Sequence, residues 1–94
     1  MTGTEKQIKW ANEIRDCVIE ILEEAIKAEP RVETVLNKII DKLNDENTYA
    51  GDIIELFKHI PNMTKKGDVT GNLARVTSTM KTTVNKDWNL KSFM

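Results

Sequence analysis

The sequence has few of the residues that form disulfide frameworks, zinc sites and catalytic centres, because its 94 residues include one cysteine and one histidine. With Cys17 alone, no disulfide within the chain and no cysteine-based zinc site can form. This cysteine usage suits a reducing compartment, so we expect the protein to be cytoplasmic. The first residues lack the apolar run of a signal peptide, and no stretch approaches the roughly 18 apolar residues that span a bilayer. We therefore expect neither export nor a membrane partner.

The composition also excludes a disordered chain. Hydrophobic residues make up 39% and charged residues 31% of the sequence, whereas disordered chains combine few apolar residues with a high net charge. The length suits one domain, and folding at this size buries about 60 to 65% of the surface of the unfolded chain. We predict a single all-α domain over residues 1–94, a small bundle of three to four helices with a thin core.

The strongest pattern predicts a long amphipathic helix over residues 5–28. Apolar residues recur at intervals of three and four from Ile8 to Ile26, which keeps one helix face apolar. Thr4 can cap this helix, because its hydroxyl reaches a free N–H of the first turn while Gln7 closes the capping box. The helix would be about 36 Å long, and its wide apolar face indicates packing against more than one neighbour.

Two shorter helices are predicted to follow, over residues 31–44 and 48–60. Pro30 suits the first turn of the earlier one, because its missing N–H would have no partner there. Thr48 can cap the later one, and Pro61 would end it. The composition after Pro61, up to residue 71, is typical of an exposed loop.

A fourth helix over residues 72–85 competes with a strand, because residues 73–84 include four threonines and two valines. Strand alternation would present a less apolar face than a helix does, so we choose the helix. Four apolar residues at helical spacing would then point inward: Leu73, Val76, Met80 and Val84. The less regular tail that follows is predicted to dock on the body through apolar residues such as Trp88 and Phe93.

No pattern of catalytic or metal-binding residues is present. A nucleophile–histidine pair would need His59, the only histidine, with Cys17 or a serine. Cys17, however, lies at the edge of the apolar helix face, where a thiol usually fills space. His59 and Glu55 have the spacing of two ligands on one helix face, but the further ligands of a metal site are missing. We predict that the protein is not an enzyme and that it holds neither a metal nor a cofactor.

Charge is distributed unevenly along the chain. Residues 1–60 hold eight Lys or Arg against 13 Asp or Glu, and residues 61–94 hold six against two. Carboxylates on the polar face of the first helix can complement a basic surface of another protein and speed its association, although a simple solvated face has the same composition. We predict a protein-binding site on this face, with the candidate residues Glu13, Asp16, Glu20, Glu23 and Glu24.

The basic segment over residues 65–91 supports an alternative function. Cations interleaved with short hydroxyl side chains can hydrogen-bond phosphates, and a homodimer would double the basic surface. A dedicated nucleic-acid-binding domain usually has a pI above about 9, whereas this sequence has a pI of about 5.8. The alternative is a helical DNA-binding transcriptional regulator that uses the candidate residues Lys65, Lys66, Arg75, Thr79, Lys81, Thr82 and Lys86.

The chain opens on Thr-Glu-Lys-Gln-Ile-Lys-Trp-Ala over residues 4–11 and continues with Ile14 and Arg15. Here it resembles small uncharacterised proteins of low-GC Gram-positive bacteria, their phages and other mobile elements, in which such a stretch begins an amphipathic helix. The resemblance covers residues 2–15. It implies an accessory, regulatory or anti-defence role, such as inhibition of a host nuclease. We therefore expect a non-enzymatic protein-binding module that acts as a phage or mobile-element inhibitor or regulator of a host protein.

Overall fold

The computed structural model describes residues 1–94 and confirms an all-α fold with a less regular C-terminal tail. No strand is present, although one isolated bridge joins Thr2 to Tyr49. None of the helices combines the length and the hydropathy needed to cross a bilayer. In chain order the elements are α1 (Glu5–Ala28), the 3-10 turn η1 (Pro30–Val32), α2 (Glu33–Asn44), α3 (Ala50–Phe57), the single-turn α4 (Ile60–Met63), α5 (Val69–Thr82), η2 (Lys86–Trp88) and η3 (Leu90–Ser92).

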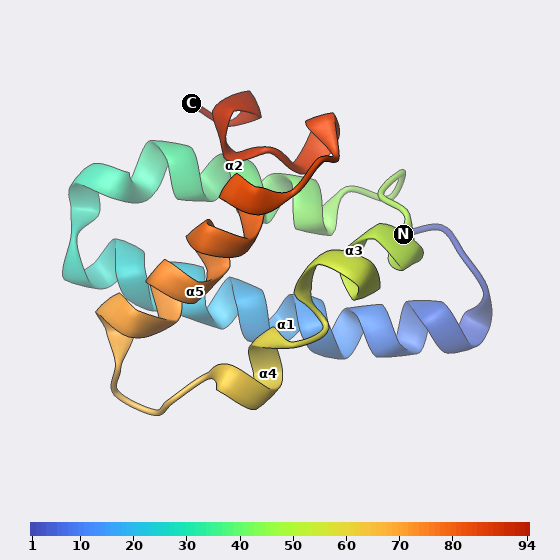
Figure 1. Cartoon of the computed structure of the whole chain (residues 1–94), viewed down its shortest axis with the longest axis horizontal. Coiled ribbons are helices and arrows are strands. Elements are labelled where there is room, and N and C mark those ends of the chain that lie inside the picture. Colours follow the sequence, from blue (N-terminus) through green and yellow to red (C-terminus); the bar gives the residue numbers. More distant parts are fainter.

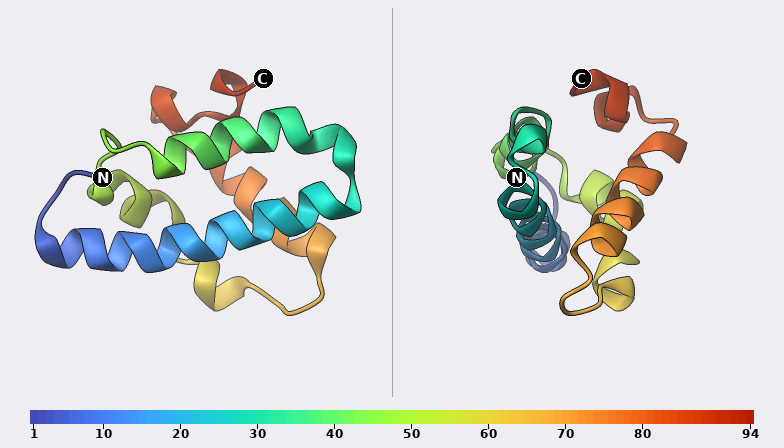
Figure 2. Two further views of the ribbon diagram at one scale, coloured as in Figure 1. Left: turned by 180° about the vertical axis from the view of Figure 1, so that it is seen from behind. Right: turned by 90° about the vertical axis from the view of Figure 1, so that its left-hand side faces the viewer.

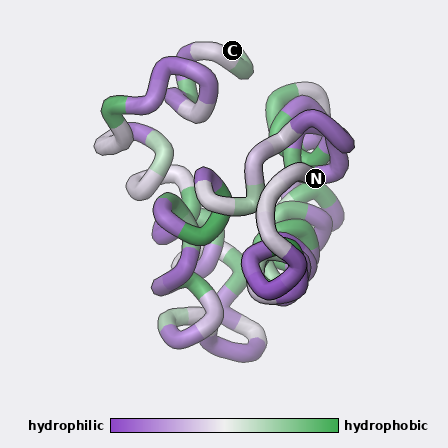
Figure 3. Tube along the Cα trace, turned by 90° about the vertical axis from the view of Figure 1, so that its right-hand side faces the viewer, coloured by the Kyte–Doolittle hydropathy of each residue, from purple (hydrophilic) through white to green (hydrophobic).

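The helices, labelled in Figure 1, form two layers. α1 and α2 lie antiparallel in one layer, and α3, α4 and α5 pack on the other side of α1 (Figure 2). Each helix contains both hydrophobic and hydrophilic residues (Figure 3). The hydrophobic ones recur at helical spacing, so each helix contributes an apolar stripe to the interior. The buried apolar side chains form one contiguous cluster of 17 residues drawn from α1, α2, α3, the start of α4, α5 and the tail.

The first helix begins and ends where the sequence predicts. The Gln7 N–H donates to the Thr4 hydroxyl oxygen at 3.2 Å, and the Thr4 N–H donates to the Gln7 side-chain oxygen at 3.0 Å, which completes the capping box. Six residues of its apolar stripe are buried: Ala11, Ile14, Val18, Ile21, Leu22 and Ala25. The 24 residues of α1 extend over about 36 Å, and the longest dimension of the whole protein is 36 Å.

The helix predicted over residues 48–60 is wrong in its boundaries, because two helices occupy this region. Thr48 caps neither of them: it is buried, and its hydroxyl donates to the Lys42 carbonyl at 2.6 Å, so it closes the end of α2 instead. α3 starts after Tyr49 without a side-chain cap and ends at Phe57. Pro61 does not end a helix but lies in the first turn of α4, where no N–H is required of it.

The helix predicted over residues 31–44 starts two residues later, because a 3-10 turn precedes it. Pro30 starts the 3-10 turn η1, and the α-helical hydrogen bonding of α2 begins at Glu33. The Glu29 carboxylate caps η1 by accepting the Arg31 N–H at 3.4 Å and the Arg31 Nε–H at 2.9 Å. This hydrogen-bonded guanidinium lowers the pKa of the exposed Glu29 carboxyl below its ordinary value.

The structure confirms a helix in place of a strand near the C-terminus, but shifts it relative to the predicted residues 72–85. α5 starts at Val69, because the Asp68 carboxylate accepts the Gly71 N–H at 3.1 Å and so caps the helix three residues earlier. The backbone becomes extended at Thr83. Val84 therefore does not point inward as predicted, and it is 98% exposed.

The tail completes the core, as its apolar residues predict. The Trp88 ring is 1% exposed and meets Phe57 edge-on, with 5.8 Å between the ring centroids. Phe93 lies on another side at 6.3 Å, and the Lys42 ammonium lies 5.3 Å from the centre of the Trp88 ring. Trp88 thus joins α2, α3 and the last residues of the chain.

We predict that Trp88→Ala destabilises the protein by about 3 to 5 kcal/mol, because it leaves a large cavity where the tail closes the core. Urea unfolding followed by circular dichroism measures this loss. Tyr49→Ala serves as the control, since Tyr49 is 65% exposed, and it should change the free energy of unfolding by about 0.5 kcal/mol or less. A loss below about 1 kcal/mol for Trp88→Ala would show that the tail does not seal the core.

Candidate functional site

The five predicted protein-binding residues lie together on the outer face of α1, which we name the acidic face: Glu13, Asp16, Glu20, Glu23 and Glu24. All five are exposed, since the opposite side of α1 packs against the other helices. Glu13 and Glu24 are 11 positions apart, or about 17 Å along the helix. The face therefore presents about one carboxylate per 3 to 4 Å, similar to the 3.4 Å per charge of one DNA strand.

Most carboxylates of the acidic face have no ionic partner within the chain. Arg15 pairs with Asp16, with its Nη2 atom 3.2 Å from the carboxylate. The other ion pairs join Arg31 to Glu29 and Arg75 to Asp68, both outside this face. The remaining four acids form no ion pair within the chain. They are thus free to pair with cations of another molecule.

A hollow of about 400 Å³ lies between α1 and the loop that joins α4 to α5. Glu20 and Glu24 line it from α1, and Lys65 and Lys66 line it from the loop. The structure thus brings residues of the two predicted sites to one place, without an ion pair between them. The opposite charges of the two pairs reduce each other's field in this hollow.

Cys17 lies in the same hollow and has a structural partner. The Thr64 hydroxyl donates to the Ile60 carbonyl at 2.8 Å, so its oxygen is free to accept from the Cys17 thiol at 3.5 Å. His59 has a different partner, with its Nε2 atom 2.9 Å from the Thr79 hydroxyl. The structure therefore does not bring Cys17 and His59 together as nucleophile and base. No group of three or more His, Cys, Asp or Glu side chains gathers as metal ligands do.

Two of the predicted nucleic-acid-binding residues, Arg75 and Thr79, make side-chain hydrogen bonds within the chain. Arg75 donates to the Asn72 side-chain oxygen at 2.9 Å and lies 3.5 Å from the Asp68 carboxylate. The Thr79 hydroxyl donates to the Arg75 carbonyl at 2.9 Å, so its oxygen accepts from the His59 ring. Their polar groups are engaged within the chain, and Arg75 has only 23% of its side chain exposed.

The other candidates of the basic segment fall into two separate groups. Lys65 and Lys66 lie in the loop before α5, whereas Lys81, Thr82 and Lys86 lie at or beyond its C-terminal end. All five are exposed. The 14 residues of α5 separate the groups by about 21 Å. The predicted basic site is thus divided between the two ends of one helix.

Asn72 is an important residue that the sequence reasoning missed. It is 2% exposed, and its amide pairs with both backbone groups of Lys65, accepting the N–H at 2.9 Å and donating to the carbonyl at 2.8 Å. The same oxygen accepts from Arg75. Asn72 therefore fastens the loop of Lys65 and Lys66 to α5. An asparagine next to a predicted loop gives no signal of such burial.

Comparison with models of protein families, with curated proteins and with solved structures gives no match. Function is therefore inferred from the residues of this chain and their positions in the fold.

We predict that Asn72→Ala destabilises the protein by about 1 to 3 kcal/mol, because the backbone groups of Lys65 and the Arg75 guanidinium lose their partner. Chemical unfolding of the variant measures this change. Asn62→Ala is the matched control, since Asn62 is exposed, and it should fall within about 0.5 kcal/mol of the wild type. Equal stability of both variants would contradict a structural role for Asn72.

Proposed function

We propose that the protein is a non-enzymatic binding module that presents the acidic face of α1 to a basic surface of another protein. The observation that carries this proposal is the row of exposed carboxylates on the longest helix, four of which have no ionic partner. A rigid helix holds these charges at fixed spacing, which lowers the entropy lost on binding. Complementary charge on the partner then gives fast association and partner choice.

The charge spacing favours a partner whose basic surface normally binds nucleic acid. The acidic face resembles one DNA strand in charge density, so it can occupy a groove of Lys and Arg side chains that binds phosphates. Such occupation competes with nucleic acid and inhibits or regulates the partner. Together with the resemblance of the opening segment, this favours a phage or mobile-element protein that acts on a host protein such as a defence nuclease.

A DNA-binding regulator is the alternative, and the positions of the basic residues give it less support. Arg75 and Thr79 are engaged in hydrogen bonds within the chain, and the remaining cations lie at two ends of α5. Neutralisation of several neighbouring phosphates supplies most non-specific DNA affinity. A monomer with divided cations is expected to bind duplex DNA weakly.

We predict that replacing Glu13, Glu20, Glu23 and Glu24 together by glutamine abolishes partner capture while the fold is retained. The tagged full chain is used to capture proteins from a lysate of a low-GC Gram-positive host, with and without nuclease treatment. The captured protein should be basic and bind nucleic acid, survive nuclease treatment, and be displaced by added duplex DNA.

The matched control replaces four exposed acids elsewhere, Glu33, Asp41, Glu46 and Asp87, by their amides. This control keeps the same net charge as the test variant and should capture the partner normally. Equal loss in both variants would contradict a specific role for the acidic face. Sub-micromolar binding of labelled duplex DNA at about 0.15 M salt, abolished by Lys81→Glu with Lys86→Glu, would favour the DNA-binding alternative.

We also predict that Cys17→Ser and His59→Gln proteins fold and capture the partner as the wild type does. Serine keeps a donor toward Thr64, and the glutamine amide can replace the ring N–H toward Thr79. Unfolding midpoints and capture yields provide the measurement. Loss of activity against the partner in either variant, with stability and capture unchanged, would indicate chemistry at that residue.

A further inference from the structure

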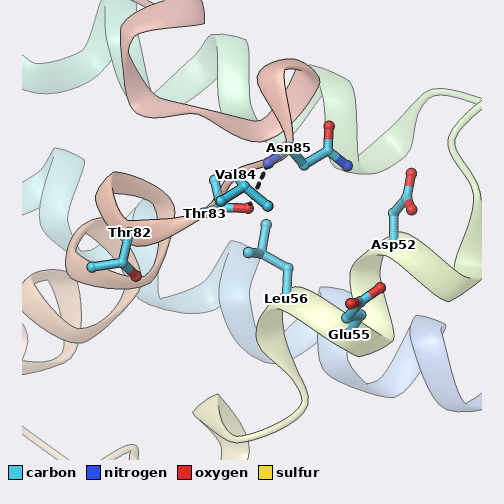
Figure 4. A pocket seen from close by; sticks show the side chains of 7 residues that line it. All are labelled: Asp52, Glu55, Leu56, Thr82, Thr83, Val84 and Asn85. Carbon is cyan, nitrogen blue, oxygen red and sulfur yellow. Dashed lines mark hydrogen bonds between the residues drawn. The ribbon is translucent and has the colours of Figure 1, made fainter.

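An open groove lies on the face opposite the α1 and α2 layer, between α3 and the segment that leaves α5. Its volume is about 460 Å³. Figure 4 shows Leu56 pointing from α3 toward Val84, with Asp52 and Glu55 beside them on the same helix. The groove thus combines an apolar pair with two carboxylates.

Val84 is the most exposed large apolar residue of the chain, with 98% of its surface accessible, and nothing in the protein covers it. Leu56 is half-buried on the facing helix. An aliphatic side chain placed between Leu56 and Val84 would remove apolar surface of both from water, at about 25 cal/mol per Å². This surface favours an apolar group in the groove.

Two carboxylates give the same groove a negative potential. Asp52 and Glu55 line it and form no ion pair, and no basic residue lines it. The C-terminal end of α5 borders the groove through Thr82 and Thr83. This last turn already contains a cation, Lys81, and the Thr82 hydroxyl donates to the Ser78 and Thr79 carbonyls at 3.1 Å. The negative potential of the groove therefore comes from the two carboxylates.

We propose that this groove binds a segment of another protein that places an aliphatic side chain between Leu56 and Val84, flanked by Lys or Arg. The apolar pair selects the aliphatic residue, and the two carboxylates, Asp52 and Glu55, select and pair with the cations. The site is distinct from the acidic face of α1 and does not depend on it.

The test is a titration of the isotope-labelled full chain with the peptide acetyl-Lys-Leu-Leu-Arg-amide, followed by NMR of the backbone amides. We expect saturable shifts confined to residues 52–56 and 82–85, with a Kd of about 1 mM or tighter. The peptide acetyl-Glu-Leu-Leu-Glu-amide should produce no such shifts. Glu55→Gln should weaken binding about two- to fivefold, and Val84→Ser should weaken it by a similar factor.

Glu33→Gln is the matched control, because Glu33 lies at the start of α2 and does not line the groove. It should leave the Kd unchanged, as should the variant that neutralises the acidic face of α1. Absence of shifts at the groove, equal shifts with the acidic peptide, or shifts on the acidic face alone would overturn the proposal. Shifts of the groove amides with protein concentration, without peptide, would overturn it in favour of a second copy of the chain.

Discussion

Burial of one face of α1 is the constraint on which the rest of the structure depends. α2, α3, α4 and α5 all contact this helix, which is as long as the protein itself. Because every neighbour packs against the inner face or its borders, the outer face remains in water along the whole molecule. Carboxylates are stable there without partners, since water solvates them. The packing that forms the core thus also creates the charged surface from which we infer binding.

The sequence predicts the fold well where local signals and packing agree. The Thr4 capping box and the regular spacing of apolar residues define α1 completely, because both act within the helix itself. The predicted helix boundaries near Thr48 and Pro61 are wrong, because each of these residue types is common at both the start and the end of helices. A threonine can cap a helix or close the previous one, and a proline can follow a helix or start one. Tertiary contacts, such as the hydrogen bond from Thr48 to Lys42, decide between them.

The sequence predicts where the acidic surface residues lie, but not how the basic ones are arranged. The acidic residues occupy the places that helical periodicity gives them, because α1 is regular and exposed on that side. The basic residues are divided because α5 separates them and Arg75 is bound to Asn72 and Asp68. Side-chain hydrogen bonds such as those from His59 to Thr79 and from Asn72 to Lys65 have no signature in the sequence pattern. The groove beside Val84 could not be predicted from the sequence either, because it forms only where α5 ends, two residues before that valine.

The central claim is that binding relies on the charges of the outer face of α1. The most direct test is the salt dependence of the association rate constant between the full chain and its captured partner, measured by stopped-flow fluorescence. Charge-steered association slows steeply as salt shortens the Debye length from roughly 14 Å at 0.05 M to below about 5 Å at 0.5 M. We predict at least a tenfold fall in the rate constant over this range, toward the value of about 10⁵ to 10⁶ M⁻¹s⁻¹ that is typical of association without steering. A rate constant that does not change with salt would contradict this claim.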